Sequence, residues 1–304
     1  SYAVGNDEPR VEEWQNEPNL TLWRCNVAHS SGLLFGSQRF THIWHLAGIA
    51  SPYWYKKLPE ETIAVAVDGT RNMLQYAREH KAKFMFTSSS EVYATASVIP
   101  TPESYIGAVP STGARACYDT SKLMAETLCY VEAQKYGTHV SLIRIHNTFG
   151  PGMAEVDRRI LPRIASAMKS GKQMQVFGKA NEPLPTRTYT PVANTLLGFL
   201  MVAIKGESMR MTHQPALPDT GIYNVGLDTD ELNVLQLVKR CVLASRNPVS
   251  SKLVPPPLNY ETEPLRRCPD VSKLRSLGWA PCQNLDTGLQ SFFEWTDKVY
   301  QGIA

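Results

Sequence analysis

The sequence lacks the features that would assign it to several large classes of protein. Its longest apolar run of note, Leu196 to Ile204, spans nine residues, whereas a membrane-spanning helix needs ~20. Its 31 basic and 28 acidic residues give a net charge of +3, far from the basic excess of a nucleic-acid-binding protein. We therefore expect no membrane span in the given chain and no nucleic-acid partner.

The six cysteines are too irregularly spaced to indicate a metal site or a disulfide framework. No two of them form a C-x-x-C pair, and no histidine cluster accompanies them. A chain of 304 residues can bury a core without covalent staples, so we expect reduced thiols, no metal and a cytoplasmic location. The first nineteen residues are polar and acidic, which is not typical of a signal peptide. A targeting or anchor segment before Ser1 is compatible with this pattern.

The first two-thirds of the chain alternate between patterns typical of strands and of helices. Short apolar segments predict strands, and apolar residues at helical spacing predict the helices between them. This order favours an α/β fold with a doubly wound parallel sheet. The expected strands are Leu20–Val27, Thr41–Leu46, Lys83–Ser89 and His139–His146, and the expected helices are Glu60–His80 and Tyr118–Tyr136.

The character of the sequence changes after Gly150. Helical patterns continue, but loops that hold much of the chain's 21 prolines separate them. We place a boundary near Gly150, between a first domain of residues 1–150 and a smaller, loop-rich part of residues 151–304. The expected helices of this second part are Ile160–Ser170, Val192–Ile204, Leu232–Ala244 and Leu285–Val299.

Hydroxyl and acidic side chains end one predicted strand, and a Tyr-x-x-x-Lys pair opens a later helix. The strand end carries Ser88 to Glu91, and ligands of open α/β sheets bind at such carboxyl ends. Tyr118 and Lys122 lie four residues apart, so they share a helix face, and the ammonium should lower the pKa of the tyrosine. Such a tyrosine can take a proton from a hydroxyl while hydride leaves the same carbon.

The Tyr-x-x-x-Lys pattern alone is weak, because it occurs a second time. Tyr53 and Lys57 match it as well, but they lie between Pro52 and Pro59, where we do not expect a continuous helix.

The sequence resembles the extended short-chain dehydrogenase/reductases that modify nucleotide sugars, and among them the UDP-glucuronic acid decarboxylases. The resemblance extends from about Asn19 to the end, and RACYD and HNTFGP are its most discriminating parts. The matching segments are HLAGIASP (45–52), TSSSEVY (87–93), ARACYDTSKLMAET (114–127), RIHNTFGPGM (144–153), TRTYTPVANTL (186–196) and PLRRCPDVSKLRSLGW (264–279).

The resemblance implies a Rossmann-like fold that binds NAD in residues 1–150. Residues 151–304 would mainly bind the nucleotide sugar, with segments that return to the first domain. Relatives commonly form homodimers through two long helices, one of them equivalent to Tyr118–Tyr136. The residues implied to contact NAD are Leu46, Ala47, Gly48, Ser88, Tyr118, Lys122 and Arg144.

The implied reaction is a redox-neutral decarboxylation of UDP-glucuronic acid to UDP-xylose through a 4-keto sugar. Tyr118, helped by Lys122 and Ser89, would take the proton of the C4 hydroxyl. Ser90 and Glu91 would lie beside the sugar carboxylate, and Arg187 would approach the substrate as a further catalytic residue. The residues implied to bind the nucleotide sugar are Asn147, Arg159, Gln175, Phe177, Arg187 and Arg267, the last at the diphosphate.

The pair Ser90-Glu91 separates the possible reactions. Related 4,6-dehydratases have Asp-Glu at these positions, and 4-epimerases of this class generally lack the glutamate. Decarboxylation is therefore the leading interpretation, with a UDP-sugar 4-epimerase or a 4,6-dehydratase as alternatives. A non-catalytic protein that binds nucleotide sugars is an alternative from another class, because the sequence has no glycine loop for NAD.

Several positions depart from the family pattern. The fingerprint G-x-x-G-x-x-G does not occur, and the segment from Val4 to Trp14 resembles the part that follows the family's second strand. We expect that the given chain is a fragment and that a first βαβ unit precedes Ser1 in the natural protein. Ala66 replaces an asparagine and Gly152 an arginine. His146 replaces an aromatic residue, and we expect it to be packed in the interior.

Overall fold

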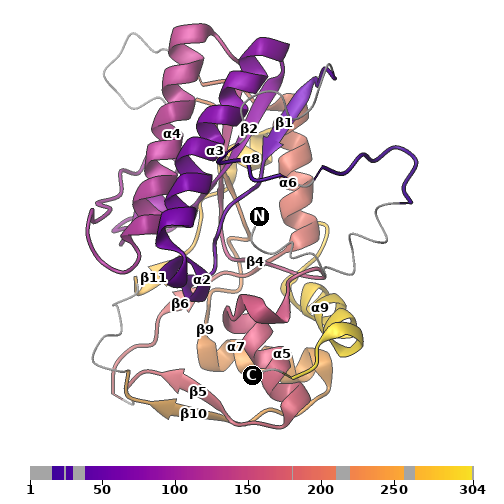
Figure 1. Cartoon of the computed structure of the whole chain (residues 1–304). Helices are drawn as coiled ribbons and strands as arrows, with labels where there is room; N and C mark the ends of the chain where they lie inside the picture. Colours follow the sequence, from indigo (N-terminus) through magenta and orange to yellow (C-terminus); the bar gives the residue numbers. More distant parts are fainter. Residues whose placement is uncertain are drawn as a thin grey trace.

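A parallel sheet of four short strands forms the centre of the upper part of the molecule (Figure 1). The computed structural model describes residues 16–23, 25–29, 38–179, 181–209, 220–256 and 264–302. The strands lie in the order β1-β2-β3-β8, and every neighbouring pair is parallel. Their bounds are His42–His45 for β1, Lys83–Ser89 for β2, Val140–Ile145 for β3 and Ile222–Val225 for β8.

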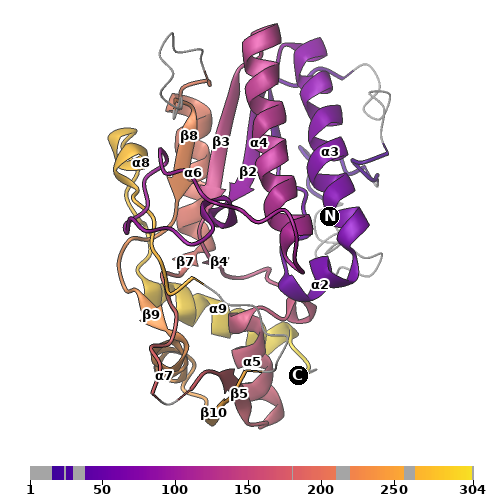
Figure 2. The same cartoon turned by 90° about the vertical axis from the view of Figure 1, so that its left-hand side faces the viewer.

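Helices cover both faces of this sheet, as a doubly wound fold requires (Figure 2). On one face, α3 (Pro59–His80) and α4 (Ala116–Tyr136) pack against β2 and β3 through a core that includes Phe84 and Leu142. On the other face, α6 (Val192–Lys205) and α8 (Ser272–Ser276) pack through a core that includes Tyr223. Because both faces are covered, β2 is a nearly continuous buried run, with only Lys83 exposed.

The ends of the two long helices are set by local sequence. Proline begins α3 at Pro59, where its missing N–H costs nothing, and two acidic residues follow in the first turn. Helix α4 ends at Gly137, whose φ of 68° lies in the left-handed region that glycine adopts without strain. The observed bounds of both helices differ from the expected ones by at most two residues.

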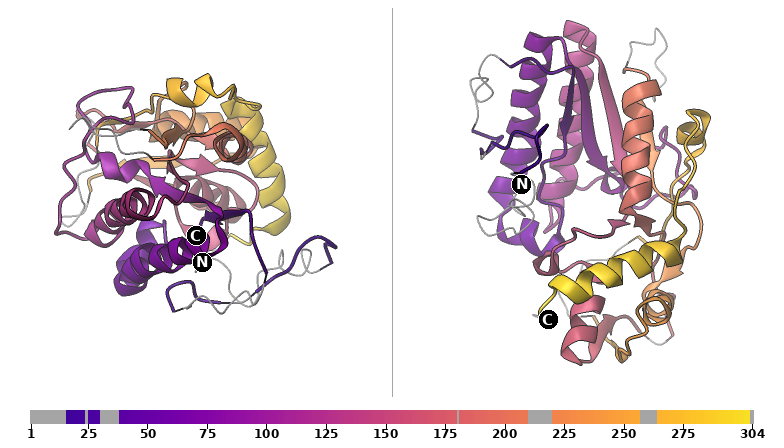
Figure 3. Two further views of the ribbon diagram at one scale, coloured as in Figure 1. Left: turned by 90° about the horizontal axis from the view of Figure 1, so that it is seen from above. Right: turned by 90° about the vertical axis from the view of Figure 1, so that its right-hand side faces the viewer.

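The lower part of the molecule is a separate helical layer with its own core. Helices α5 (Ile160–Ser170), α7 (Val234–Ser245) and α9 (Leu285–Val299) pack around side chains such as Ile164, Leu237 and Phe292. Figure 3 shows α9 below α6, where it closes this layer. A parallel strand pair, β5 (Met174–Phe177) with β10 (Ser251–Val254), forms its outer edge.

Short pieces of structure join the two parts. They are α2 (Pro52–Lys57), the 3-10 turns η1 (Ser90–Tyr93) and η2 (Glu155–Asp157), β4 (Thr148–Phe149) paired with β7 (Thr190–Pro191), and β6 (Thr186–Arg187) between β9 (Leu232–Asn233) and β11 (Arg266–Arg267). The chain returns to the upper part at α6, β8 and α8. The division near Gly150 therefore stays a proposal about a boundary that the chain crosses more than once.

The structure corrects two sequence-based expectations. The segment Leu20–Val27 is not a strand: its described residues have no regular structure, and Leu20 and Leu22 are exposed. Tyr53 and Lys57 do lie on one helix, contrary to our expectation, because Pro52 is the first residue of α2 and Leu58 ends it before Pro59. Lys57 Nζ donates a hydrogen bond of 2.7 Å to the Tyr53 hydroxyl.

Helix α2 is tied to the 3-10 turn η2 of the lower part. Ser51 Oγ donates to the carbonyl of Asp157, and Trp54 Nε1 donates to the carbonyl of Val156 at 2.7 Å. The guanidinium of Arg158 lies 4.3 Å from the centre of the Tyr53 ring. These contacts fix the relative positions of the two parts on one side of the molecule.

A buried ion pair joins β3 to α4. Arg144 donates from Nε and Nη2 to the carboxylate of Glu126 at 3.0 and 2.7 Å, and from Nη1 to the carbonyl of Glu103. Ser88 Oγ also donates to Glu126, and the side chains of Arg144 and Glu126 are each only 9% exposed. Each charge of the pair compensates the other, so neither is buried without a partner.

Replacing Arg144 by methionine should destabilise the protein by about 3–5 kcal/mol, because Glu126 would keep a buried charge without its partner. Urea unfolding would measure the loss. Arg71→Met is the matched control, since Arg71 and Asp68 form an exposed pair. The double variant Arg144→Met, Glu126→Leu should recover much of the stability; equal losses in the single and double variants would contradict this account.

Candidate active site

A cavity of about 580 Å³ lies between the upper and lower parts, at the carboxyl ends of the sheet strands. The end of β2, the loop after β1 and the start of α4 form its upper wall. Helix α5, β5 and β6 contribute its lower wall. A cavity of this size and placement suits a large ligand that spans both parts.

Most of the site residues expected from the sequence line this one cavity. They include all six expected catalytic residues and all six expected substrate contacts: Ser89, Ser90, Glu91, Tyr118, Lys122, Asn147, Arg159, Gln175, Phe177, Arg187 and Arg267. Of the expected cofactor contacts, Leu46, Gly48, Ser88, Tyr118 and Lys122 also line it.

Two expected cofactor contacts are not in the cavity wall. Arg144 does not line the cavity, because its guanidinium is directed into the interior by the ion pair with Glu126. Ala47 is also not among the lining residues, although its neighbours Leu46 and Gly48 are. The cavity lining thus gives no support to these two assignments, which stay predictions, whereas the ion pair gives Arg144 a structural role.

Tyr118 lies in the first turn of α4 and is 7% exposed. Its ring stacks on that of Tyr55, with centroids 5.2 Å apart and planes at 10°. Burial raises the pKa of Tyr118 to about 12, although a hydrogen bond with Ser89 acts in the opposite direction. The expectation that Lys122 lowers this pKa is therefore wrong for the chain by itself, because burial outweighs the effect of nearby cations.

Lys122 lies one turn beyond Tyr118 and is 4% exposed. Its Nζ donates a hydrogen bond of 2.7 Å to the carbonyl of Thr87, which directs the ammonium to the end of β2. Burial lowers the pKa of Lys122 to about 8. The site therefore holds a lysine that loses its proton more easily than usual and a tyrosine that loses its proton less easily than usual.

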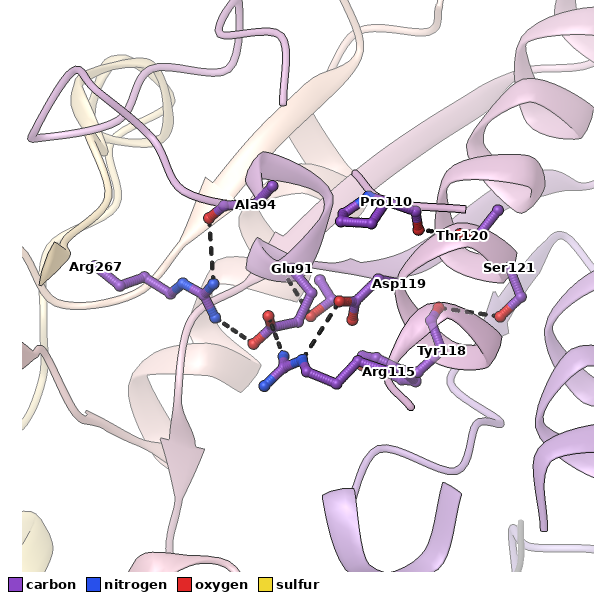
Figure 4. A network of polar contacts seen from close by, with 10 residues as sticks. Glu91, Ala94, Pro110, Arg115, Tyr118, Asp119, Thr120, Ser121 and Arg267 are labelled. Carbon is purple, nitrogen blue, oxygen red and sulfur yellow. Dashed lines mark hydrogen bonds and ion pairs between the residues drawn. The ribbon is translucent and has the colours of Figure 1, made fainter. Parts of the chain in front are cut away.

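The carboxylate of Glu91 is held between two arginines (Figure 4). Arg267 Nη1 donates to one of its oxygens and Arg115 Nη2 to the other. Burial alone would raise the pKa of Glu91, but the charges of Arg267 and Arg115 outweigh it and lower the pKa to about 2. Glu91 is therefore ionised at every physiological pH.

Arg115 and Asp119 are site residues that sequence reasoning missed. Arg115 lines the cavity, and its Nε lies 3.4 Å from Asp119 Oδ2. Burial and the nearby Glu91 raise the pKa of Asp119 to about 6. Their signal was present in the segment ARACYDTSK, where they stand three residues before and one residue after Tyr118.

The cavity wall is strongly basic. Among the residues that the structure describes, seven cationic side chains line it, whereas Glu91 is the single acidic one. An excess of this kind within a concave, partly dry site attracts a ligand that carries several negative charges. The seven residues are Arg115, Lys122, Arg158, Arg159, Arg163, Arg187 and Arg267.

His146 is packed in the interior, as the sequence analysis expected. It is fully buried, and its Nε2 lies 3.3 Å from Asn224 Oδ1. Burial lowers its pKa to about 3, so the imidazole is neutral.

Across the described residues, no group of three or more His, Cys, Asp or Glu side chains could hold a metal ion. In the same part of the chain, no helix combines the length and apolar character that crossing a membrane requires.

Comparison with known proteins assigns the family. The profile described as "NAD dependent epimerase/dehydratase family" matches residues 3–226. The chain belongs to this family. UDP-glucuronic acid decarboxylase 3 of Arabidopsis thaliana is 32% identical over 290 residues, which cover 95% of this chain and 78% of that protein. UDP-glucuronic acid decarboxylase 1 of Xenopus tropicalis is 31% identical over 298 residues, or 97% of this chain and 64% of that protein.

Solved structures at lower sequence identity share the fold. UDP-glucose 4-epimerase of Thermotoga maritima with UDP-glucose superposes with a TM-score of 0.80 at 21% identity, covering 94% of this chain and 87% of that one. UDP-glucuronic acid 4-epimerase of Bacillus cereus, in complex with UDP-glucuronic acid and NAD, gives 0.77 at 19% identity, covering 95% and 85%. The Rossmann-like α/β fold is thereby confirmed.

The described residues fit the nicotinamide end of NAD, the cofactor of the family. Leu46 exposes 49% of its surface beside Gly48 in the cavity wall. A Cβ on Gly48 would lie 3.3 Å from Lys122 Nζ, so glycine keeps the ammonium within reach of the cavity. These residues, with Ser88 and Tyr118, would hold the nicotinamide ribose. NAD bound there supplies an acceptor for hydride from a sugar carbon. The sequence has no glycine loop for the pyrophosphate, so the fit concerns this end alone.

Replacing Lys122 by methionine should abolish activity and yet stabilise the protein at neutral pH. Because burial lowers the pKa of Lys122 from 10.5 to about 8, the folded state disfavours the ammonium. A shift of this size costs roughly 3 kcal/mol, and the lost hydrogen bond to Thr87 offsets about 1 kcal/mol of the gain. The free energy of unfolding should therefore rise by about 2 kcal/mol at pH 7.

The gain in the free energy of unfolding of Lys122→Met over the wild-type protein should shrink as the pH rises. Between pH 8 and 10.5 the unfolded lysine still binds a proton that the folded protein has released, so the wild-type protein becomes relatively more stable there. Urea unfolding at pH 7 and pH 10 would show the difference shrinking as the pH rises. Lys298→Met, at an exposed position of α9, is the control. A Lys122→Met protein that is less stable at both pH values would refute the argument.

Proposed function

We propose that this protein is an NAD-dependent decarboxylase that converts UDP-glucuronic acid to UDP-xylose. The observation that carries the proposal is that Tyr118 and Glu91 line one basic cavity, with the pair Ser90-Glu91 at the end of β2. The decarboxylases of Arabidopsis thaliana and Xenopus tropicalis, to which the chain is 32% and 31% identical, support the choice among the reactions of the family. The basic wall supports a substrate that carries a diphosphate and a carboxylate.

The first chemical step would be oxidation at C4 of the sugar. Tyr118 takes the proton of the C4 hydroxyl, Ser89 holds the same oxygen in line, and hydride leaves the carbon for the cofactor. Lys122 contributes a buried positive charge one helix turn away, which favours the phenolate once the tyrosine gives up its proton. The product of this step is a 4-keto sugar whose carbonyl is β to the carboxylate on C5.

The second step would be loss of carbon dioxide. The C5–C6 bond breaks, its electron pair forms an enolate with the C4 carbonyl, and carbon dioxide leaves. A proton added at C5, hydride returned to C4 and the proton returned from Tyr118 to the C4 oxygen then give the pentose, so the overall reaction consumes no oxidant. We assign Glu91 and Ser90 to the wall beside C5, and Arg187 to the stabilisation of the developing negative charge.

The lower wall would bind the nucleotide. Gln175 and Phe177 of β5 line the cavity, and a ring and an amide are suited to stacking on and hydrogen bonding with a uracil. Arg159 is oriented by a two-point ion pair with Asp157, from Nε at 2.6 Å and from Nη2 at 2.9 Å. We assign Arg159 and Asn147 to the ribose and diphosphate, together with Arg267.

Incubation of the full-length natural protein with NAD and UDP-glucuronic acid should release carbon dioxide and form UDP-xylose. Gas capture would measure the carbon dioxide, and NMR would identify the sugar nucleotide. Tyr118→Phe should lower turnover by at least ~10³-fold with UDP affinity unchanged, because only the proton acceptor is lost. Tyr105→Phe is the matched control, since the Tyr105 hydroxyl accepts from the Ser97 amide and does not line the cavity.

Other products would overturn the proposal in recognisable ways. A UDP-hexuronate epimer without gas release would identify a 4-epimerase, and a 4-keto-6-deoxy product from a neutral UDP-hexose would identify a dehydratase. Tight UDP binding with neither NAD binding nor turnover would identify a non-catalytic binding protein.

The cytoplasmic location stays a prediction from the cysteine pattern.

We also propose that the protein is a homodimer joined through α3 and α4. Large apolar side chains on the outer face of α4 are 36–46% exposed at helical spacing: Leu123, Met124, Tyr130 and Val131. Ile63 of α3 is 45% exposed as well. A second copy related by two-fold symmetry would bury these side chains in a four-helix bundle.

Val131→Glu should convert the dimer to a monomer, because it would place a charge in the apolar interface. Sedimentation equilibrium would measure the mass. Leu243→Glu, at a position of α7 that is 76% exposed, is the control and should leave the mass unchanged. A wild-type protein that sediments as a monomer at all concentrations would refute the proposed dimer.

A further inference from the structure

The carboxylate of Glu91 occupies a site that is built to hold a carboxylate. Each of its oxygens accepts from a different arginine, Arg115 on one side and Arg267 on the other, and Arg187 adds a third positive charge nearby. All four side chains line the cavity. A substrate that brings its own carboxylate into this space must share or replace the bonds that Glu91 makes.

Arg115 is held next to the helix turn that carries Tyr118. It is the N-cap residue of α4, and its carbonyl accepts from the amides of Tyr118 and Asp119 at 3.0 Å. Arg115 stands three residues before Tyr118, so the two side chains leave the same side of the helix. Figure 4 shows its guanidinium extending from the start of α4 below the Glu91 carboxylate. Both residues line the cavity, so one ligand bound there can contact Tyr118 and Arg115 together.

Asp119 forms a second ion pair with Arg115. Its Oδ2 lies 3.4 Å from Arg115 Nε, and the aspartate side chain is 13% exposed. With Glu91 and Asp119 counted against Arg115, Arg187 and Arg267, the cluster keeps one net positive charge. One further carboxylate would neutralise it. The other two arginines have additional bonds in the wall: Arg187 donates to the Thr186 carbonyl and Arg267 to the Ala94 carbonyl.

We propose that Arg115 binds the carboxylate of the sugar in exchange for Glu91 and thereby selects hexuronate-bearing nucleotides over neutral ones. The proposal rests on the proposed function, in which C5 of the sugar lies next to the carbon at Tyr118. When the substrate carboxylate takes the bond from Arg115, one oxygen of Glu91 is released toward the sugar. Two carboxylates side by side also raise each other's proton affinity, which makes Glu91 a better proton carrier than it is in the free protein.

The test is the binding of three nucleotides to full-length protein that carries Tyr118→Phe and bound NAD, so that no turnover occurs. Isothermal titration with UDP, UDP-glucose and UDP-glucuronic acid should show the tightest binding for the uronate. Adding Arg115→Gln should weaken UDP-glucuronic acid ~10–100-fold and leave UDP and UDP-glucose within about threefold. Arg115→Lys should keep part of the preference, since it retains the charge but loses the fork of donors.

Arg240→Gln is the matched control, because Arg240 is ion-paired with Asp286 and does not line the cavity. It should change none of the three affinities. A loss of equal size for all three nucleotides, or an unchanged preference in Arg115→Gln, would overturn the proposal. Circular dichroism identifies a variant that fails to fold, and Arg115→Lys then decides the question.

The experiment separates this inference from the proposed function. If the wild-type protein releases carbon dioxide while Arg115→Gln keeps the uronate preference, Arg115 is not the carboxylate site and the function stands. If the protein prefers the uronate, and loses that preference with Arg115→Gln, but releases no carbon dioxide, the carboxylate site stands and the proposed function fails.

Discussion

One carboxylate joins three separate segments of the chain at the boundary between the two parts. Glu91 follows β2, Arg115 is the N-cap residue of α4, and Arg267 lies on β11, one of the pieces that join the two parts. Removing these charges from water costs free energy, and the cost is smallest when all three are paired, so the pairing favours one arrangement of the segments. The turn with Ser89 and the first turn of α4 with Tyr118 take their positions from it.

Burial acts in opposite directions on the two sides of the cavity. At Tyr118 and Lys122, burial disfavours the charged form, and the Ser89 hydrogen bond and the Glu126 charge do not outweigh it. At Glu91, the arginines overcome the same effect and keep the carboxylate ionised. The site therefore has one end where burial disfavours charge and one end with fixed charge, suited to binding anions.

The sequence was sufficient for those features that depend on local periodicity and spacing. The bounds of β2, α5 and α9 are the expected ones, and Tyr118 and Lys122 meet as their spacing requires. Contacts between distant segments were not readable: no local pattern predicts the ion pair between Arg144 of β3 and Glu126 of α4. Strand pairs such as β5 with β10 are too short to give a pattern. Leu20–Val27 has strand-like composition, but composition cannot supply a neighbouring strand.

The contacts between α2 and η2 join the two walls of the cavity. Ser51 Oγ and Trp54 Nε1 donate to the carbonyls of Asp157 and Val156. The carboxylate of the same Asp157 orients Arg159 in the cavity wall. Asp157 therefore has two roles: its backbone is bonded to the N-cap residue of α2, and its side chain positions a cation of the cavity.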